Sequence, residues 1–335
     1  MKNFALLLLF LTFSLSVSAQ VYIQNTMYRY TPVLYNPAAA GMTQGEDQGL
    51  KLAFLGRLQW VGIDGAPRTS AITADAGVGN NMGLGAYLIG DQLGPISTTG
   101  LNVAYSYQFE FGLGNKLSIG VNGGILQKAI NGDFVTPDGV PDPLVGMGFY
   151  SATSFIPNLG AGIYFSGLND RLTIGLSGQD LLEPSVEGLF LQDVGTTTTV
   201  PRSFYVMAGY KIPITQSADG SEDIFSITPM VFARTEGTFP PQFDVSVFAD
   251  YKVLTGGLSY RGFNDSFSAI LGFDVNDRMF LGYSFDYTLS PLNASQDLSS
   301  HEIILTYSLR GGLGRSGASD GVKKDNDTGG GILLP

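Results

Sequence analysis

Apolar and polar residues alternate along three successive runs near the C-terminal end of the chain. From Phe267 to Val275, from Met279 to Tyr287 and from Ile303 to Leu309, every second residue is apolar, and most residues between them are polar or glycine. A period of two is typical of β-strands with one apolar and one polar face. Each run has about the 9–11 residues that a tilted strand needs to cross a bilayer. The pattern therefore predicts transmembrane strands with lipid outside and a water-filled interior.

Applied to the whole chain, the same pattern predicts fourteen antiparallel strands. An even number is typical of single-chain bacterial barrels. Pro229 lies inside one of the expected strands and predicts a bulge or a local irregularity there. The expected strands are 49–60, 68–77, 82–91, 96–111, 115–128, 154–166, 170–180, 202–212, 223–234, 241–251, 254–263, 265–275, 277–289 and 299–309.

The lengths of the connections support this count. Every second connection is short and rich in Gly, Asn or Asp, which suit tight hairpin turns: 79–81, 112–114, 167–169, 252–253 and 276–277. The long connections 129–153, 181–201 and 290–298 fall between them, and only 213–222 is longer than its place predicts. Outer-membrane barrels have short periplasmic turns and long outer loops. We therefore expect an all-β, up-and-down antiparallel transmembrane β-barrel with both termini in the periplasm.

The ends of the chain suggest export and two segments outside the barrel. Lys2, the apolar run at 5–17 and the small residues Val17-Ser18-Ala19 are typical of a signal peptide. The expected division is a signal peptide at 1–19, a periplasmic N-terminal arm at 20–48, a barrel at 49–310 and a Gly- and charge-rich disordered tail at 311–335. The arm is a candidate plug of the barrel or a docking segment.

Composition separates the barrel from a soluble β-sandwich, the alternative fold that also produces alternating strands. Charged residues make up 14% of the chain, against about 25% in ordinary soluble domains. Aromatic residues reach 12%, which suits the aromatic girdles of a barrel. The chain has no cysteine, which excludes disulfides and thiolate metal sites. A net charge of −11 argues against nucleic acid as a partner.

Catalytic chemistry is not indicated by any motif. The single histidine, His301, begins a strand next to a long connection, where we expect a solvated residue of the rim. There is no Gly-x-Ser-x-Gly motif, and the aspartates in 129–153 lack the spacing of an EF-hand calcium loop. The sequence therefore predicts a protein that is not an enzyme and has no catalytic residue, cofactor or metal site.

Three segments stand out as candidate partner-binding sites. The Asn-Pro turn of the arm is followed by small residues, which let the backbone approach another surface closely. A second segment holds the only tryptophan, for which a position in the aromatic girdle is the simpler interpretation. The third begins the last strand. The candidate residues are Tyr35, Asn36, Pro37, Ala38 and Gly41 in the first segment, Gln59, Trp60, Asp64 and Pro67 in the second, and His301 and Glu302 in the third.

Together these segments resemble the PorP/SprF family of Bacteroidetes outer-membrane proteins. The resemblance rests on Asn-Pro-Ala and Ala-Gly within 36–41, Gln-Trp-Val-Gly-Ile-Asp-Gly-Ala-Pro at 59–67, Asp-Gln-Leu-Gly-Pro at 91–95 and Ser-His-Glu-Ile at 300–303. It implies a fourteen-stranded barrel that works in type IX secretion and gliding motility. The implied partners are other type IX secretion components in the periplasm and outer membrane, and an exported substrate or adhesin. Ala39 departs from the family, where a larger and often aromatic residue is expected.

Three functions therefore remain for the barrel. The favoured one is a non-enzymatic outer-membrane component that docks partners at both faces and assists the export or surface attachment of a secreted protein. The alternative is a passive porin or small-solute channel, whose cation-favouring pore the residues Asp244, Ser246, Asp250, Asp274 and Asp286 would line. A third possibility, an outer-membrane hydrolase, would depend on His301.

Overall fold

The computed structural model describes most of the chain between residues 24 and 309. The described residues are 24–42, 49–79, 81–112, 114–134, 148–187, 197–218, 223–237, 240–262, 265–289 and 298–309. The predicted signal peptide at 1–19 and the predicted tail at 311–335 lie outside them. Within the described residues, no helix is long and apolar enough to cross a bilayer.

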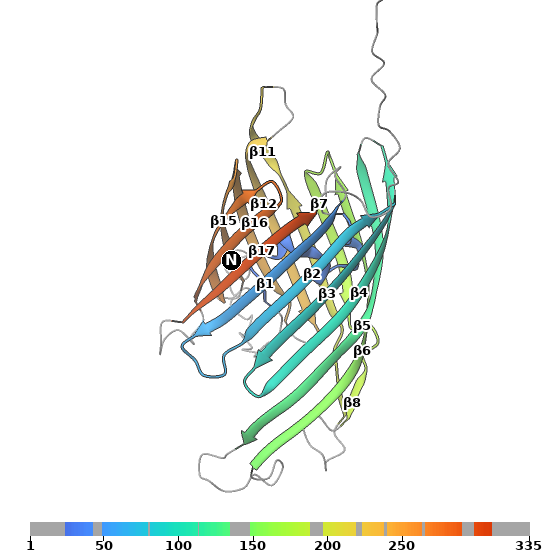
Figure 1. Ribbon diagram of the computed structural model, residues 1–335, viewed down its shortest axis with the longest axis vertical. Coiled ribbons are helices and arrows are strands. Elements are labelled where there is room, and N and C mark those ends of the chain that lie inside the picture. The colour runs from blue at the N-terminus through green and yellow to red at the C-terminus, as the bar shows by residue number, and fades with distance from the viewer. Residues whose placement is uncertain are drawn as a thin grey trace, which may run out of the picture.

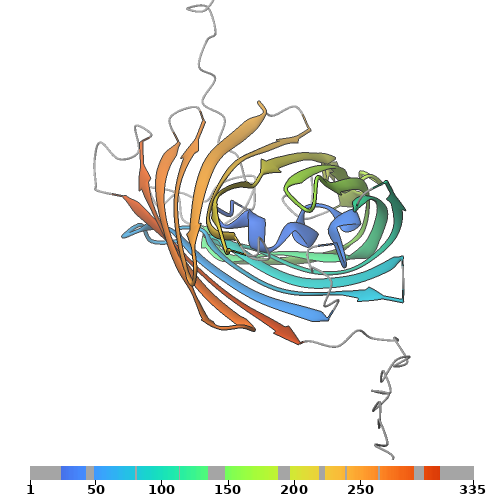
Figure 2. The ribbon, with the colours of Figure 1, turned by 90° about the horizontal axis from the view of Figure 1, so that it is seen from above.

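The strands form a closed antiparallel barrel (Figures 1 and 2), in which β1 pairs with β17. β10 and β11 pair with successive parts of β12, so the fifteen strands of the sheet occupy 15 − 1 = 14 positions in the wall. The predicted fourteen-stranded barrel is confirmed. The wall consists of β1 (Leu50–Val61), β2 (Arg68–Val78), β3 (Met82–Leu93), β4 (Ile96–Phe111), β5 (Asn115–Phe134), β6 (Gly148–Gly167), β7 (Leu172–Gln179), β10 (Ser203–Tyr210), β11 (Ile212–Gln216), β12 (Asp223–Glu236), β13 (Gln242–Tyr251), β14 (Leu254–Arg261), β15 (Ser266–Asn276), β16 (Met279–Thr288) and β17 (Ser299–Leu309).

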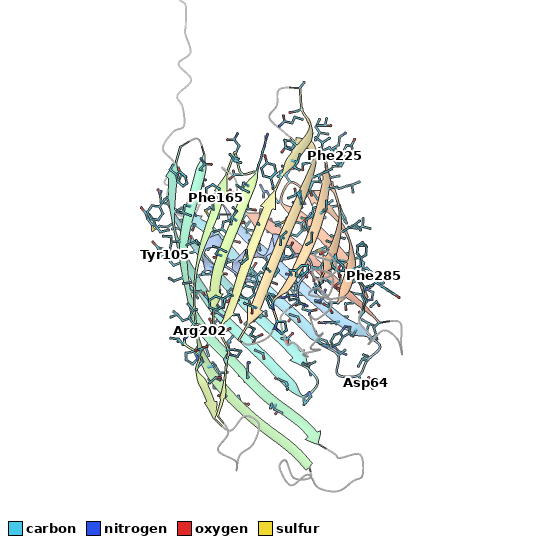
Figure 3. The ribbon with its side chains drawn as sticks, turned by 180° about the vertical axis from the view of Figure 1, so that it is seen from behind. Asp64, Tyr105, Phe165, Arg202, Phe225 and Phe285 are labelled. Carbon is cyan, nitrogen blue, oxygen red and sulfur yellow. The ribbon has the colours of Figure 1, made fainter. Side chains whose placement is uncertain are left out.

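Apolar side chains cover the outside of the barrel, and polar ones face inward. Along β15, Phe267 and Leu271 are exposed whereas Ser266 and Ser268 are buried. The labelled Tyr105, Phe165 and Phe285 lie on the outer surface of the wall (Figure 3). A soluble protein would hide such a surface, but a bilayer is its natural solvent. The alternation in the sequence is thus confirmed, and the soluble sandwich is excluded.

Pro229 coincides with a break in the wall. β12 pairs with β13 without interruption through Pro229, which lies opposite Val247. On its other side β12 pairs with β10 up to Met230 and with β11 from Ile227, so the ladder is interrupted next to the proline. A proline has no N–H to donate to a ladder. The predicted irregularity is therefore present. β11 also continues the strand predicted at 202–212, so the connection predicted at 213–222 shortens to 217–222.

β5 and β6 are longer than the predicted strands 115–128 and 154–166. They pair as far as Phe134 opposite Gly148, and the pair extends beyond its neighbours in Figure 1. The alternation had ended at Ala129 and Ile130, which are both buried. Beyond these residues β5 and β6 stay paired although apolar and polar residues no longer alternate. The connection predicted at 129–153 is therefore reduced to 135–147. The connection predicted at 181–201 likewise contains a short hairpin of β8 (Ser185–Glu187) and β9 (Thr197–Thr199).

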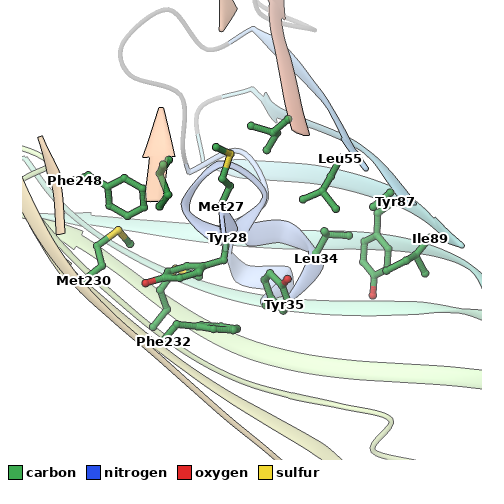
Figure 4. Packing of buried hydrophobic residues seen from close by; sticks show 14 of the residues in the cluster. Met27, Tyr28, Leu34, Tyr35, Leu55, Tyr87, Ile89, Met230, Phe232 and Phe248 are labelled. Carbon is green, nitrogen blue, oxygen red and sulfur yellow. The ribbon is translucent and has the colours of Figure 1, made fainter. Parts of the chain in front are cut away.

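Residues 24–42, here called the internal arm, lie inside the barrel (Figure 2). They form three short 3-10 turns, η1 (Tyr28–Tyr30), η2 (Pro32–Leu34) and η3 (Pro37–Ala39). Met27, Tyr28 and Tyr35 pack among side chains of the wall (Figure 4). The prediction of a water-filled interior is therefore corrected. Protein fills this part of the interior, since inward polar residues such as Ser268 and Ser284 are buried rather than solvated.

The internal arm spans the interior between the two ends of the barrel. Gly41 contacts Asp75 near the end of the barrel that carries the short turns, here called the short-turn end. Gln24 contacts Gln59 and Arg261 near the opposite end, where the long connections lie. This opposite end is called the long-loop end below.

Candidate functional site

One end of the internal arm fits a groove lined by glycines of the wall. A Cβ atom added to Gly120 would lie well within 3.0 Å of the backbone nitrogen of Ala38, and one added to Gly83 would lie closer still to the carbonyl oxygen of Ala40. Such contacts are too short for any side chain, so only glycine fits at these positions. The close approach expected from the small residues of the arm is seen here. We call the wall positions Gly83, Gly85, Gly120, Gly162 and Gly175 the glycine groove.

Asn36 fixes the course of the arm in this groove. Its Oδ1 accepts a hydrogen bond from the backbone N–H of Ala38 (2.9 Å), which caps η3. Its Nδ2 donates to the carbonyl oxygens of Ile163 (2.9 Å) and Leu176 (3.3 Å) on β6 and β7. Ala39, the residue that departs from the family, packs with Tyr164 of the wall. The side chain of Asn36 thus positions the arm, because it is hydrogen-bonded both to the backbone of the arm and to the backbone of the wall.

Aromatic rings hold the middle of the arm. Tyr28 stacks on Phe232 with ring centroids 4.7 Å apart, and its hydroxyl donates to the Oγ of Ser246 (3.2 Å). The carbonyl oxygen of Tyr35 accepts hydrogen bonds from Ser177 (2.7 Å) and Gln179 (3.2 Å). Tyr28 and Tyr35 are thus buried against both rings and polar groups of the wall. A cavity of about 10 Å³ remains beside Tyr35, which is about the space that one water needs.

Six buried charged residues line the wall near the other end of the arm. Arg57 contacts Asp286 (2.6 Å) and Glu302 (3.1 Å). Arg261 contacts Asp244 (2.9 Å), and Arg234 lies 3.8 Å from the same carboxylate. The three cations balance the three anions, and all six side chains are almost completely buried. Buried charges are tolerated when they are paired in this way. We call these six residues the charge cluster.

The charge cluster binds the backbone of the arm. The two carboxylate oxygens of Glu302 accept the N–H groups of Thr26 and Met27, both at 2.8 Å. The hydroxyl of Thr26 donates to Asp286 (3.0 Å) and accepts from Arg261 (3.3 Å). Hydrogen bonds to charged groups are about twice as strong as neutral ones. The start of the arm is therefore held by directed polar bonds rather than by shape.

The structure brings the first predicted segment and parts of the other two together. Tyr35, Asn36, Pro37, Ala38 and Gly41 are buried in the arm, and Glu302 belongs to the charge cluster. Gln59 donates to Gln24 of the arm (3.1 Å). Trp60 lies at an irregularity between β1 and β17 with a φ of 50°, and its N–H donates to Ser300 (3.1 Å). Contact of these candidate residues with another protein stays a prediction.

Asp64, Pro67 and His301 lie apart from the internal arm. Asp64 is exposed at the long-loop end (Figure 3), and the carbonyl oxygen of Pro67 accepts from the N–H of Gln59. His301 is on the outward face of β17, where its Nδ1 shares a 2.6 Å hydrogen bond with the hydroxyl of Tyr283 and its Nε2 lies 3.3 Å from the Oγ of Ser299. Glu302 and Asp286 point inward instead. The hydroxyl of Tyr283 therefore takes the position beside Nδ1 of His301 that a carboxylate would hold in a hydrolase triad.

Sequence reasoning named the three acidic residues of the charge cluster, in other roles, but missed their arginine partners and the glycine groove. Arg57, Arg234 and Arg261 occupy positions inside expected transmembrane strands, where an unpaired charge is costly. Their presence in a chain so poor in charge was the available signal that buried partners exist. Among the residues that the structure describes, no group of three or more His, Asp or Glu could hold a metal ion.

The fold and the filled interior define an outer-membrane β-barrel with an internal N-terminal segment. Two solved structures of similar shape are the CymD monoaromatic hydrocarbon channel (TM-score 0.51, 12% identity, covering 85% of this chain and 94% of that one) and the Pseudomonas putida toluene transporter TodX (TM-score 0.50, 11% identity, covering 83% and 93%). At these identities the likeness shows the fold alone. No curated protein matches the chain.

The family is shown by the sequence. The model of the type IX secretion system membrane protein family PorP/SprF matches residues 17–307, so the chain belongs to this family. The predicted resemblance is confirmed. The chain is accordingly a membrane component of the type IX secretion system, and its fold is that of an outer-membrane β-barrel.

Proposed function

We propose that this barrel is a non-enzymatic component of the type IX secretion and gliding machinery that assists the export or surface attachment of a secreted protein such as an adhesin. It docks other components of the system at its periplasmic face and the exported protein at its outer face. Family membership supports the system, and the internal arm supports the role. The short-turn end is assigned to the periplasm by analogy with other outer-membrane barrels.

The observation that carries this proposal is the occupied interior. The arm crosses the barrel from the level of Gln24 to that of Gly41, and both ends are bonded to the wall. Three of the four aspartates expected to line a porin are paired instead, Asp244 and Asp286 with arginines of the wall and Asp250 with Arg29 of the arm. The fourth, Asp274, is exposed. A lumen neutralised and filled in this way favours a protein that meets partners at its faces over a passive channel.

Deletion of the gene in the native host tests the proposal. Loss of a secreted or surface-attached protein, with normal uptake of small nutrients, is the expected result. Unaltered secretion with an uptake defect contradicts it and supports the porin. Complementation with the His301→Ala variant should restore secretion fully, because His301 makes no contact with the arm; failure to do so supports the hydrolase instead.

The arm itself is tested by conductance in planar bilayers. A barrel that lacks residues 20–48 should conduct more than the intact protein, because the arm occupies the interior. Equal conductance of the two proteins would contradict the idea that the arm plugs the barrel. Crosslinking followed by purification from the native membrane then identifies which face meets each partner.

A further inference from the structure

We propose that the charge cluster and the adjoining aromatic site form a peptide-binding site, for which the internal arm is the resident and replaceable occupant. The ligand is a peptide segment that contacts the charge cluster through uncharged groups and has a hydroxyl residue followed two positions later by an aromatic residue, as in Thr26 and Tyr28. The competing occupant is a segment of the exported protein. This inference rests on the proposed function, which supplies such a protein.

The charge cluster keeps its charges paired without the arm. Arg57 contacts Asp286 and Glu302, and Arg261 contacts Asp244, with both residues of every pair located on barrel strands. A buried charge that loses its partner is strongly destabilising, but departure of the arm removes no charge from this cluster. The site can therefore be emptied and refilled without breaking the network that lines it.

Every contact of the arm with the charge cluster comes from neutral groups that many peptides carry. Glu302 accepts the N–H groups of two successive residues, Thr26 and Met27, and Asp286 accepts the hydroxyl of Thr26. A carboxylate that binds two consecutive backbone N–H groups recognises peptide backbone rather than a particular sequence. Sequence preference comes from the hydroxyl and from the ring of Tyr28 on Phe232.

The arm is also not part of the sheet. It forms three 3-10 turns and contributes no strand to the wall, whose fourteen positions close without it. Its removal therefore leaves the ladders of the barrel complete.

The position of the site decides which peptide can reach it. Arg57, Arg261 and Asp286 lie close to the long-loop ends of β1, β14 and β16, and Asp244 and Glu302 lie near the starts of β13 and β17 at that same end. A segment that enters from the long-loop end meets the charge cluster before it meets the glycine groove. With long loops outside the cell, that segment belongs to a protein on the outer face.

The exchange is tested on the folded full chain. A protease site is placed in the connection 43–48, the purified protein is cut after folding, and a fluorescent synthetic peptide of residues 24–42 is added. We expect the labelled peptide to replace the cut arm and to migrate with the barrel. An excess of unlabelled peptide should release it again.

Changes in the peptide leave the barrel untouched and so avoid misfolded variants. Replacing the N–H of Met27 by an ester oxygen should weaken competition about tenfold or more, since it removes a hydrogen bond to a carboxylate. The same replacement at Arg29, outside the charge cluster, is the matched control and should cost much less. Thr26→Val in the peptide should behave like the Met27 ester, and Thr26→Ser like the parent.

Two results overturn the inference. One is a cut arm that never exchanges, and the other is a Met27 ester that competes as well as the parent peptide. Loss of a surface protein on gene deletion, combined with no exchange, removes the inference and leaves the proposed function intact. Exchange without any secretion defect supports the peptide site and contradicts the proposed function.

Discussion

The two ends of the internal arm are held by different physical means. Near Thr26 the arm is bound by carboxylates and a guanidinium, through hydrogen bonds that water or another peptide could replace. Near Ala38 the arm is bound by shape in addition to the hydrogen bonds of Asn36, because its backbone lies against the glycines of the wall. Directed polar bonds tolerate exchange of the partner, whereas a groove without side chains accepts only small residues. The difference teaches that the polar end binds mainly backbone groups and one hydroxyl, whereas the glycine groove admits only small residues.

The strongest test of this comparison removes a charge from the cluster. Arg57→Met leaves Asp286 without its 2.6 Å partner and Glu302 without its 3.1 Å partner. We expect the free energy of unfolding to fall by about 3–5 kcal/mol, because Glu302 loses its cation and Asp286 keeps only Arg261, 3.9 Å away. Urea titration of the protein in lipid, followed by the fluorescence of Trp60, measures the change.

A surface pair provides the control for Arg57→Met. Lys116 lies 3.6 Å from Glu110, whose side chain is 55% exposed. Lys116→Gln should therefore cost less than about 1 kcal/mol. Equal effects of the two variants would show that the cluster contributes no more than an exposed ion pair.

The second test fills the glycine groove. Gly120→Val places a side chain in space that the backbone of Ala38 already occupies, so the arm must shift. Overpacking of this kind costs about 1–3 kcal/mol. Gly123→Val on the same strand is the matched control, because a Cβ there meets no atom within 4 Å. Conductance and urea titration should both separate the two variants, and an identical response would refute the groove.

The third test removes one hydroxyl from the polar end. Thr26→Val deletes the donor to Asp286 and the acceptor for Arg261. Hydrogen bonds to charged groups are worth about 1.5–3 kcal/mol, and we expect a loss near the lower value because the cluster stays paired. Thr26→Ser should restore stability. Should the serine variant be as unstable as the valine variant, the methyl packing of Thr26 rather than its hydroxyl would be responsible.

The smallest effect concerns a carboxyl outside the strands. Burial raises the pKa of Asp180 to about 6, and Lys128 opposes the shift. Because this pKa lies above the ordinary value, the stabilisation is present below about pH 4 and is lost as the pH rises through about 6. The N–H of Leu181, bonded to the carbonyl oxygen of Leu159, should be more protected from hydrogen exchange at pH 5 than at pH 7.5, by about 1 kcal/mol.

Asp180→Asn provides the control for this pH dependence. The amide does not titrate, and asparagine tolerates the φ of 57° at this position. After correction for intrinsic exchange rates, the variant should show equal protection at the two pH values. A pH dependence that persists in the variant would assign it to another group.

The strands of the barrel were predictable because their signal is local. Phe267 and Ser268 point to opposite faces in any extended backbone, whatever the rest of the chain does. Pro229 likewise announced an irregularity through its missing N–H. The ends of β5 and β6 were not predictable, because pairing around Phe134 and Gly148 continues without alternation.

The candidate site was predictable only in part. The Asn-Pro turn and the small residues after it indicated close backbone contact, but the surface that they contact was not evident. Glu302 was selected from its motif and Asp286 only as a residue that would line a porin, whereas Arg57 was not selected, since nothing local distinguishes its role. Thr26 and Glu302 are 276 residues apart in the chain, and the closure of β1 on β17 brings them together.

The sequence by itself determined that this chain is a fourteen-stranded barrel with an apolar exterior, because strand faces follow from a period of two along each segment. Only the tertiary structure decided what fills the barrel and which charges pair. Those contacts join residues from distant strands, and their positions depend on the register of every ladder around the wall. A local pattern cannot encode them.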